Sequence, residues 1–163
     1  MKPIMDDNEP VIYVDETSFN LWDTKAMTWM SNKQSFGVPI PAHRNNGLTA
    51  YMAIGNCLTV PYVHLIRGST NQQCFLEFLR LLTEHIDRSK WPEDMKPHLV
   101  HDGHTAHRTA EVVNLMRLHF RPLRIPRYSC RFNSIEHLFG FIKNGYRKIN
   151  LDKCIRNNKN QSE

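Results

Sequence analysis

The hydrophobic pattern of the chain changes its period near residue 70, and this change limits the folds that the chain can adopt. Before that point the apolar segments are short, β-branched and aromatic, which is typical of strands. Beyond it, apolar residues recur at helical spacing at Phe75, Phe78, Leu79, Leu82 and Ile86. Two later helical segments alternate with short apolar ones. Strands followed by alternating helices and strands predict a mixed sheet with helices on its faces.

The turn residues between these segments give the element bounds. The predicted strands cover residues 11–19, 26–31, 48–56, 98–101 and 121–125, and residues 58–67 form a further extended segment. The predicted helices cover residues 70–88, 107–118 and 134–149, and Ser69 or Thr70 is the expected N-cap of the first. The resulting order, βββ-α-β-α-β-α, matches the ribonuclease-H-like architecture. This is an α/β fold with a mixed five-stranded sheet flanked by helices.

Length and composition indicate one globular domain. The 163 residues are 40% hydrophobic and 23% charged. We expect the domain to span residues 11–150, between an N-terminal tail at 1–10 and a polar, fraying C-terminal tail at 151–163. No apolar run approaches the roughly 18 residues of a membrane span. The acidic start also lacks the apolar segment of a signal peptide.

The four cysteines are widely spaced and include no CxxC pair. They are Cys57, Cys74, Cys130 and Cys154. This spacing favours reduced thiols over a disulfide framework or a zinc site. We therefore expect an intracellular protein, in the nucleus of a eukaryote and otherwise in the cytoplasm.

The net charge of +5 is distributed unevenly along the chain. Residues 1–116 hold 10 Lys/Arg and 13 Asp/Glu, whereas residues 117–163 hold 11 Lys/Arg and three acids. A basic end of this kind is typical of a chain that binds a polyanion such as DNA. A solvated face that happens to be basic is the alternative on charge alone. The predicted DNA-binding residues are Arg127, Arg131, Lys143, Arg147 and Lys148.

Three carboxylates each stand at the end of a separate predicted element. Asp15 is near the end of the first strand, Asp102 follows the 98–101 strand, and Glu136 lies in the first turn of the last helix. Each has an ordinary explanation by itself: a solvated strand end, a turn or cap, and a capping box begun by Asn133. Alternation along the first strand also predicts that Asp15 and Glu16 point to opposite faces, so that only one of them faces a given site.

Together the three carboxylates indicate a metal site. Strand ends are where functional groups gather in open α/β sheets, and the first and fourth strands are expected to be neighbours. Hard oxygen ligands suit Mg²⁺ or Mn²⁺. Two such ions about 4 Å apart can support an in-line phosphodiester displacement. We therefore predict Asp15, Asp102 and Glu136 as catalytic and metal-binding residues.

The last predicted helix carries two different stripes. Glu136, Gly140, Lys143 and Arg147 fall at helical spacing on one of them, so the acid and two cations share a face. The apolar stripe that should face the core consists of Ile135, Leu138, Phe139, Ile142 and Ile149. This arrangement predicts that a DNA phosphate held by the basic residues would run past the metal site.

A histidine-rich run, HDGHTAH, surrounds Asp102. Its histidines are spaced three apart at His101, His104 and His107, which a zinc site on a helix could use. Gly103 interrupts the run, and no cysteine or fourth ligand is close by in sequence. The run therefore favours His107 as a residue that orients groups near the site or caps the second helix.

Three segments resemble the catalytic blocks of DDE-type transposases of the mariner superfamily and their bacterial insertion-sequence relatives. They read VDETSF, HDGHTAHR and IPRYSCRFNSIEHLFGFIK. The first block supplies an Asp before a Glu, which matches Asp15. The second matches Asp102 and His107, and the third matches Asn133 and Glu136. Asp102 and Glu136 are 34 positions apart, close to the spacing in that family.

This resemblance implies both a fold and an activity. It implies a ribonuclease-H-like catalytic core that uses Mg²⁺ or Mn²⁺, with two ions expected. It implies cleavage at transposon ends and joining of the freed 3′-hydroxyl to target DNA. His107 and Asn133 would support the site. DNA is the expected partner, a homodimer is left open, and no membrane or small-molecule cofactor is expected.

The sequence also departs from the pattern of that family. Gly103 stands where the family has Asn, Phe139 stands where it has Trp, and three prolines of the third block are replaced by Arg127, Cys130 and Ser134. Because the first catalytic strand begins near residue 11, we expect the chain to lack the family's N-terminal helix-turn-helix domain. The alternative is therefore a non-catalytic DNA-binding remnant or a domesticated scaffold. A nuclease acting on RNA–DNA hybrids would share the fold, but the sequences of the three blocks favour the transposase.

Overall fold

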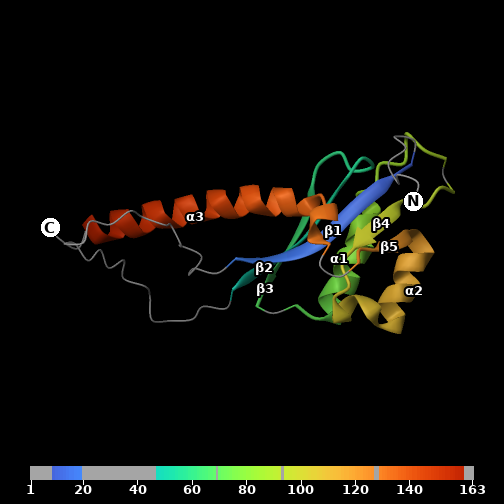
Figure 1. The fold of residues 1–163 in the computed structure, drawn as a ribbon, viewed down its shortest axis with the longest axis horizontal. Helices are drawn as coiled ribbons and strands as arrows, with labels where there is room; N and C mark the ends of the chain where they lie inside the picture. The colour runs from blue at the N-terminus through green and yellow to red at the C-terminus, as the bar shows by residue number, and fades with distance from the viewer. Residues whose placement is uncertain (1–8, 20–46, 69, 93, 127–128, 160–163) are drawn as a thin grey trace.

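One mixed sheet organises the molecule. The computed structural model describes residues 9–19, 47–68, 70–92, 94–126 and 129–159 (Figure 1). Its five strands are β1 (Val11–Phe19), β2 (Leu48–Gly55), β3 (Tyr62–Arg67), β4 (His98–His101) and β5 (Arg121–Arg124), in the spatial order β3-β2-β1-β4-β5. The first three strands pair antiparallel, and β4 and β5 run parallel to β1. This is the ribonuclease-H-like arrangement that the element order predicted.

A close approach of two backbones fixes the beginning of β1. A Cβ on Gly55 would lie 2.1 Å from the carbonyl oxygen of Val11, and no side chain could move aside to make room. The backbone N–H of Val11 also donates to Asn56 Oδ1 at 2.8 Å. Only glycine allows this spacing, so the register of β1 against β2 is set at this end.

Two helices cover one face of the sheet and enclose the larger core. They are α1 (Gln72–Glu84) and α2 (Ala110–His119), and the 3₁₀ turn η1 (Thr105–Arg108) precedes α2. Phe75, Phe78 and Tyr51 are fully buried there, with ring centroids 5.3–5.9 Å apart. Aromatic packing at these separations adds to the stabilisation from burial.

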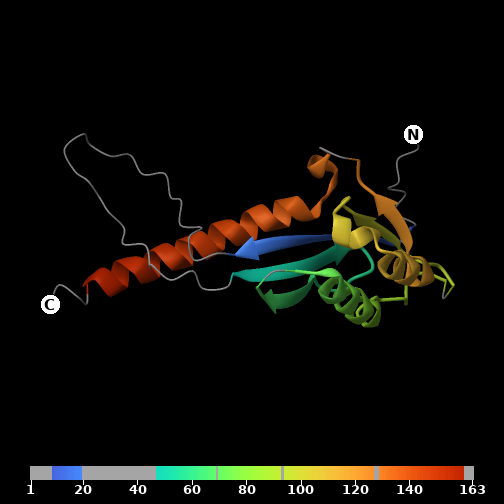
Figure 2. The same cartoon turned by 90° about the horizontal axis from the view of Figure 1, so that it is seen from below.

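The third helix, α3 (Ile135–Lys159), lies on the opposite face and extends past the end of β1 (Figures 1 and 2). It packs through Ile135 and Phe139 onto a smaller core, and Leu138, Ile142 and Tyr146 are partly buried against it. Ile149 is 57% exposed, so the prediction that it faces the core is wrong. A second 3₁₀ turn, η2 (Cys130–Phe132), leads into this helix. None of the helices in the described part of the chain combines the length and apolarity that a membrane span requires.

The observed elements differ from the predicted ones in three respects. The third strand of the sheet is β3, within the segment that we predicted only as extended, and the predicted strand at 26–31 lies outside the described residues. The N-cap of α1 is Asn71, whose side chain accepts the N–H of Cys74 at 3.0 Å. Helix α3 continues ten residues beyond the predicted end at 149, into the segment expected to fray.

Candidate functional site

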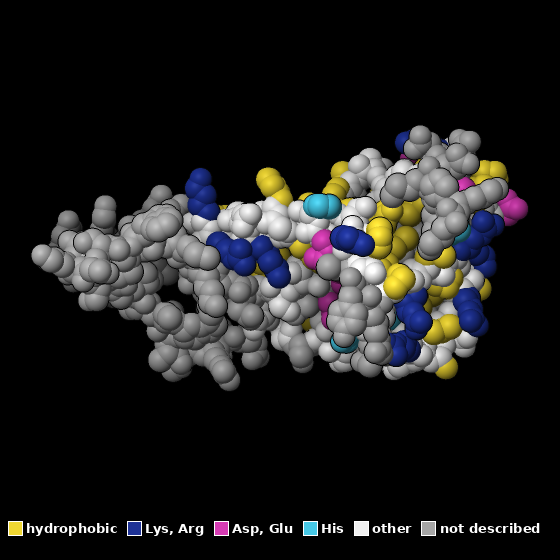
Figure 3. All heavy atoms as spheres, in the orientation of Figure 1, with side chains coloured by type: hydrophobic (Ala, Val, Ile, Leu, Met, Phe, Trp, Pro, Cys, Tyr) yellow, Lys and Arg dark blue, Asp and Glu magenta, His cyan; other side chains and the backbone are white. Residues whose placement is uncertain are grey.

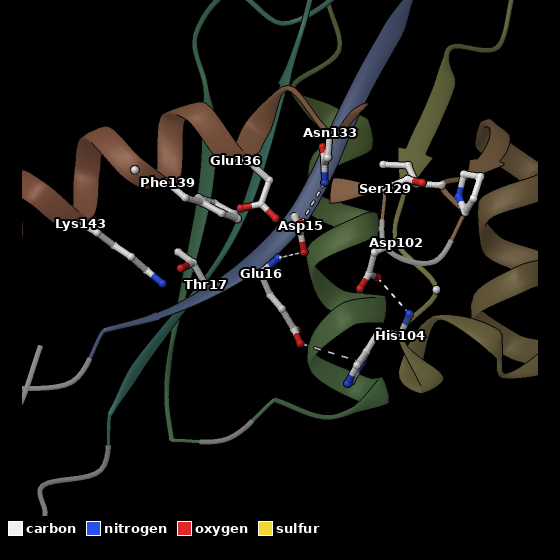
Figure 4. A pocket seen from close by; sticks show the side chains of 14 residues that line it. Asp15, Glu16, Thr17, Asp102, His104, Ser129, Asn133, Glu136, Phe139 and Lys143 are labelled. Atoms are coloured by element: carbon white, nitrogen blue, oxygen red, sulfur yellow. Dashed lines mark hydrogen bonds and ion pairs between the residues drawn. The ribbon is translucent and has the colours of Figure 1, made fainter. Parts of the chain in front are cut away.

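A cavity of about 810 Å³ opens where β1, β4 and α3 meet. In Figure 3 acidic side chains lie at the foot of α3, with Lys and Arg side chains on either side of them. Figure 4 shows the lining side chains from close by. The lining residues are Asp15, Glu16, Thr17, Asp102, Gly103, His104, Ile125, Pro126, Ser129, Asn133, Glu136, Phe139, Gly140 and Lys143. The three predicted carboxylates therefore share one cavity.

Strand register brings two of these carboxylates to the same level. Val11 pairs with His98 and Tyr13 with Val100 in the parallel β1–β4 ladder. Continuing this register by two residues aligns Asp15 with the first residue after β4, which is Asp102. The predicted neighbourhood of the first and fourth strands is thus confirmed.

Asp15 is half-buried and held by two donors. The backbone N–H of Glu16 donates to its Oδ1 at 2.8 Å, and the Asn133 amide donates to its Oδ2 at 2.9 Å. The pKa of Asp15 is raised from 3.8 to about 6. Burial is the main cause, the Glu16 N–H opposes it, and the negative charges of Asp102 and Glu136 add to it. These three carboxylates are therefore close enough to repel one another.

Asp102 is in the opposite electrostatic situation. His107 Nδ1 lies 2.8 Å from its Oδ1, and the backbone N–H of His104 donates to the same oxygen at 3.1 Å. The contact with His107 is the main cause that lowers the pKa of Asp102 below its usual value. The His107 ring is buried and stacks on Phe75 with centroids 4.0 Å apart. His107 therefore contacts Asp102 and does not cap α2, whose N-cap is Thr109.

Glu136 lies in the first turn of α3 and points into the cavity towards Asp15 (Figure 4). The capping-box alternative fails at Asn133. Its Nδ2 donates to Asp15, and its Oδ1, the atom that would cap the helix, has no hydrogen-bond partner among the described residues. The carbonyl of Asn133 accepts the N–H of Glu136 at 3.1 Å. Asn133 is almost fully buried, so it connects the start of α3 to β1.

The prediction that only one of Asp15 and Glu16 faces a given site is wrong. Both line the cavity, and Glu16 Oε1 lies 3.9 Å from His104 Nδ1. Glu16 Oε2 is buried without a hydrogen-bond partner among the described residues. Sequence analysis also missed His104 as a lining residue. Its place in the histidine run beside Asp102 was the signal that could have found it.

The predicted DNA-binding residues divide into separate groups. Lys143 lines the cavity on the same stripe as Glu136 and Gly140, as the helix spacing predicted. Arg147 donates to Asn144 Oδ1 at 3.4 Å and does not line the cavity. Arg131 and Lys148 are exposed and also outside the cavity lining. Arg127 lies outside the described residues.

Whether the cavity fits a metal ion depends on two things, the chemical type of the ligand atoms and their arrangement in space. Three carboxylates in one cavity are the hard oxygen donors that Mg²⁺ and Mn²⁺ prefer. Within the described ranges no Lys or Arg forms an ion pair with these carboxylates. However, no three His, Cys, Asp or Glu side chains within the described ranges are arranged to hold a metal ion. The chemistry therefore fits, while the ligands do not converge in this structure.

A mixed sheet of this topology with a carboxylate-lined cavity at the ends of β1 and β4 defines a ribonuclease-H-like α/β protein. Residues 10–156 match the family described as DDE superfamily endonuclease, and the chain therefore belongs to this family. The resemblance noted in the three sequence blocks is thereby confirmed. The sequence matches no curated protein.

Several solved structures share this fold. One is described as the Mos1 transposase paired-end complex with left transposon end (14% identity, TM-score 0.64, covering 83% of this chain and 41% of that one). Another is the Mos1 mariner paired end complex with Mn (15%, 0.65, 83% and 41%), and a third is the Mos1 Strand Transfer Complex (15%, 0.64, 83% and 40%). At these identities the likeness shows the fold. The chain spans about two fifths of the length of these proteins.

Proposed function

We propose that this chain is the catalytic domain of a DNA transposase, which cleaves a DNA strand and joins the freed 3′-hydroxyl to target DNA. The observation that carries the proposal is the meeting of Asp15, Asp102 and Glu136 in one cavity, from three elements far apart in sequence. Membership of the DDE endonuclease family and the DNA complexes among the similar structures support it.

The chain's own residues would prepare the site as follows. Asp15, Asp102 and Glu136 would supply the ligands of Mg²⁺ or Mn²⁺, and two ions are expected. When bound, such ions activate the attacking oxygen and stabilise the leaving one. Asn133 and the Glu16 N–H fix the Asp15 carboxylate, while His107 fixes that of Asp102.

Lys143 is the residue best placed to hold the DNA backbone at the cavity. It lines the cavity from α3, on a different stripe of the helix from Phe139, which packs in the smaller core. Its ammonium group can contact a phosphate while the carboxylates face the reacting atoms. Arg131, Arg147 and Lys148 would then contact DNA outside the cavity.

The second candidate function is a non-catalytic DNA-binding remnant. The observation that favours it is the lack of a converged metal-binding group among the described residues. Under this alternative the carboxylates would persist without binding metal, and the basic residues alone would engage DNA.

One experiment separates the two functions. Wild-type protein, Asp102→Ala and Glu136→Ala are incubated with supercoiled DNA and Mn²⁺, with Glu84→Ala as a matched control because Glu84 is exposed on α1. We expect each cavity variant to lower the nicking rate by more than about 100-fold, since it removes a predicted metal ligand. The control should nick at the wild-type rate.

Mn²⁺ affinity, measured by calorimetry without DNA, provides a second readout. The transposase proposal expects wild-type protein and Glu84→Ala to bind Mn²⁺ and the two cavity variants to lose this binding. Wild-type protein that binds DNA, yet nicks no better and binds Mn²⁺ no tighter than Asp102→Ala, would establish the remnant instead. Thermal melting of all four proteins checks that each is folded.

A further inference from the structure

A second concave surface lies beside the cavity, between α2 and β5. This groove has a volume of about 400 Å³, and its lining includes three arginines, Arg108, Arg117 and Arg124, and two histidines, His101 and His107. All three arginines are exposed. None of them is among the DNA-binding residues that the sequence predicted. We refer to this surface as the arginine groove.

The cations of the arginine groove are not neutralised. In the part of the chain that the structure describes, no Lys or Arg forms an ion pair with a carboxylate. The nearest acid of α2 in sequence, Glu111, accepts a hydrogen bond from Gln72 at 3.0 Å and so is directed towards α1. Lys96 adds another cation, because its Nζ donates to the Arg117 carbonyl at 2.9 Å. Figure 3 shows Lys and Arg side chains gathered over α2 and β5.

The arginine groove and the cavity lie on two sides of one loop. Gly103 lines the cavity, and its carbonyl accepts hydrogen bonds from the Arg108 guanidinium, with Nε at 3.0 Å. The position of a Cβ on Gly103 would be 3.8 Å from Cδ of Arg124. A strand leaving the cavity across Gly103 would therefore meet these guanidinium groups next.

We propose that the arginine groove binds the sugar-phosphate backbone of DNA that extends from the cavity. This inference rests on the proposed function, since it takes DNA as the substrate of the cavity. Guanidinium groups match phosphate oxygens as planar, multidentate donors. The three arginines have no carboxylate partner among the described residues, which leaves them available to DNA. A contact with phosphate is sequence-independent and positions the duplex. The groove would act separately from the basic residues of α3.

The test compares the salt dependence of DNA binding in matched double variants. Arg117→Ala/Arg124→Ala removes two groove cations but leaves Arg108, which contacts the Gly103 loop. The control, Arg67→Ala/Arg80→Ala, removes the same charge from β3 at the opposite sheet edge and from α1. Binding of a fluorescein-labelled duplex is followed by anisotropy in EDTA over a series of KCl concentrations.

We expect the groove variant to lower the slope of log affinity against log salt by about 1.8, or roughly 0.9 for each lost phosphate contact. The control should lower it by much less, and Arg117→Lys/Arg124→Lys should retain most of the slope because each lysine keeps the charge. An unchanged slope in the groove variant, or an equal loss in the control, overturns the inference. Mn²⁺-dependent nicking by wild-type protein then shows whether the proposed function survives that result.

Discussion

The two faces of the sheet are built differently. On the α1/α2 face, fourteen described residues form a buried cluster that includes five aromatic or leucine side chains of α1, namely Phe75, Leu76, Phe78, Leu79 and Leu82. On the α3 face the corresponding cluster has five buried members among the described residues, and the cavity opens beside it. The first face therefore supplies stability, while the second leaves room for a substrate.

The same contrast appears in the carboxylates at the edge between these faces. Asp102 contacts His107, which is stacked on the α1 residue Phe75, and its pKa is lowered. Burial raises the pKa of Asp15, and the negative charges of Asp102 and Glu136 add to this effect. The contact with His107 thus favours the ionised form of Asp102, whereas burial and the neighbouring charges disfavour the ionised form of Asp15.

The largest expected effect on stability is on the α1/α2 face, which we call the closed face, and it comes from Phe78→Ala. The α3 face, where the cavity opens, is the open face. Phe78 is fully buried and lies 5.3 Å from the ring of Tyr51 and 5.8 Å from that of Tyr62. Removing the ring leaves a cavity and should lower the free energy of unfolding by about 3–5 kcal/mol. Urea denaturation measures this, with Phe141→Ala as the control because Phe141 on α3 is 79% exposed. A loss below about 1 kcal/mol would contradict the contrast between the faces.

The closed face was also the more predictable one. Helical spacing identified Phe75, Phe78 and Leu82 as buried, because the core of a helix packed on a sheet is a local pattern repeated over several turns. The same spacing misplaced Ile149. Periodicity identifies the apolar face of α3, but it carries no information on where the sheet beneath the helix ends.

The site was predictable in its main residues and not in its surroundings. Asp15 and Asp102 could be paired because the element order makes their strands neighbours. Glu16 could not be placed, because alternation along β1 does not show where the strand loses its neighbour on the β4 side. The β1–β4 ladder covers only Val11 to Tyr13, so at Asp15 the strand is paired with β2 but not with β4, and the cavity is lined by both Asp15 and Glu16. The contact of Arg108 with the Gly103 loop could not be predicted either, because it depends on the geometry of η1.

A smaller effect, of opposite sign, is expected on the open face from Asp15→Asn. Because burial raises the pKa of Asp15 to about 6, the folded protein binds this proton more tightly than the unfolded chain. The stability contributed by the group is full below about pH 4 and is lost as the pH rises through 6. The asparagine variant does not undergo this loss, so it should be more stable than wild type at pH 8.

We expect a gain on the order of 1 kcal/mol at pH 8 after allowance for solvent screening, which corresponds to a melting temperature higher by roughly 2–4 °C. The local hydrogen bonds allow the change. Asn133 Oδ1 has no partner among the described residues, so a flip of this amide would let it accept from the new Asn side chain. Melting in EDTA at pH 5 and pH 8 measures the gain. Equal melting shifts at both pH values would show that the charge of Asp15 is not its cause.

The smallest expected effect separates two asparagines that precede helices on opposite faces. Asn71 caps α1 with its side chain, whereas Asn133 precedes α3 and donates to Asp15. Asn71→Ala should lower the free energy of unfolding by about 1 kcal/mol and leave Mn²⁺-dependent nicking unchanged. Asn133→Ala should cost less stability, because it also removes a buried oxygen without a partner.

Nicking should respond in the reverse order. Without its amide donor the Asp15 carboxylate is held by the Glu16 N–H alone among the described residues, so Asn133→Ala should slow nicking by about 10-fold or more. Parallel urea denaturation and nicking assays on the two variants provide the comparison. If Asn71→Ala slowed nicking as much as Asn133→Ala, nicking would not depend specifically on the cavity of the open face. The assignment of Asn133 as a positioning residue for Asp15 would then be wrong.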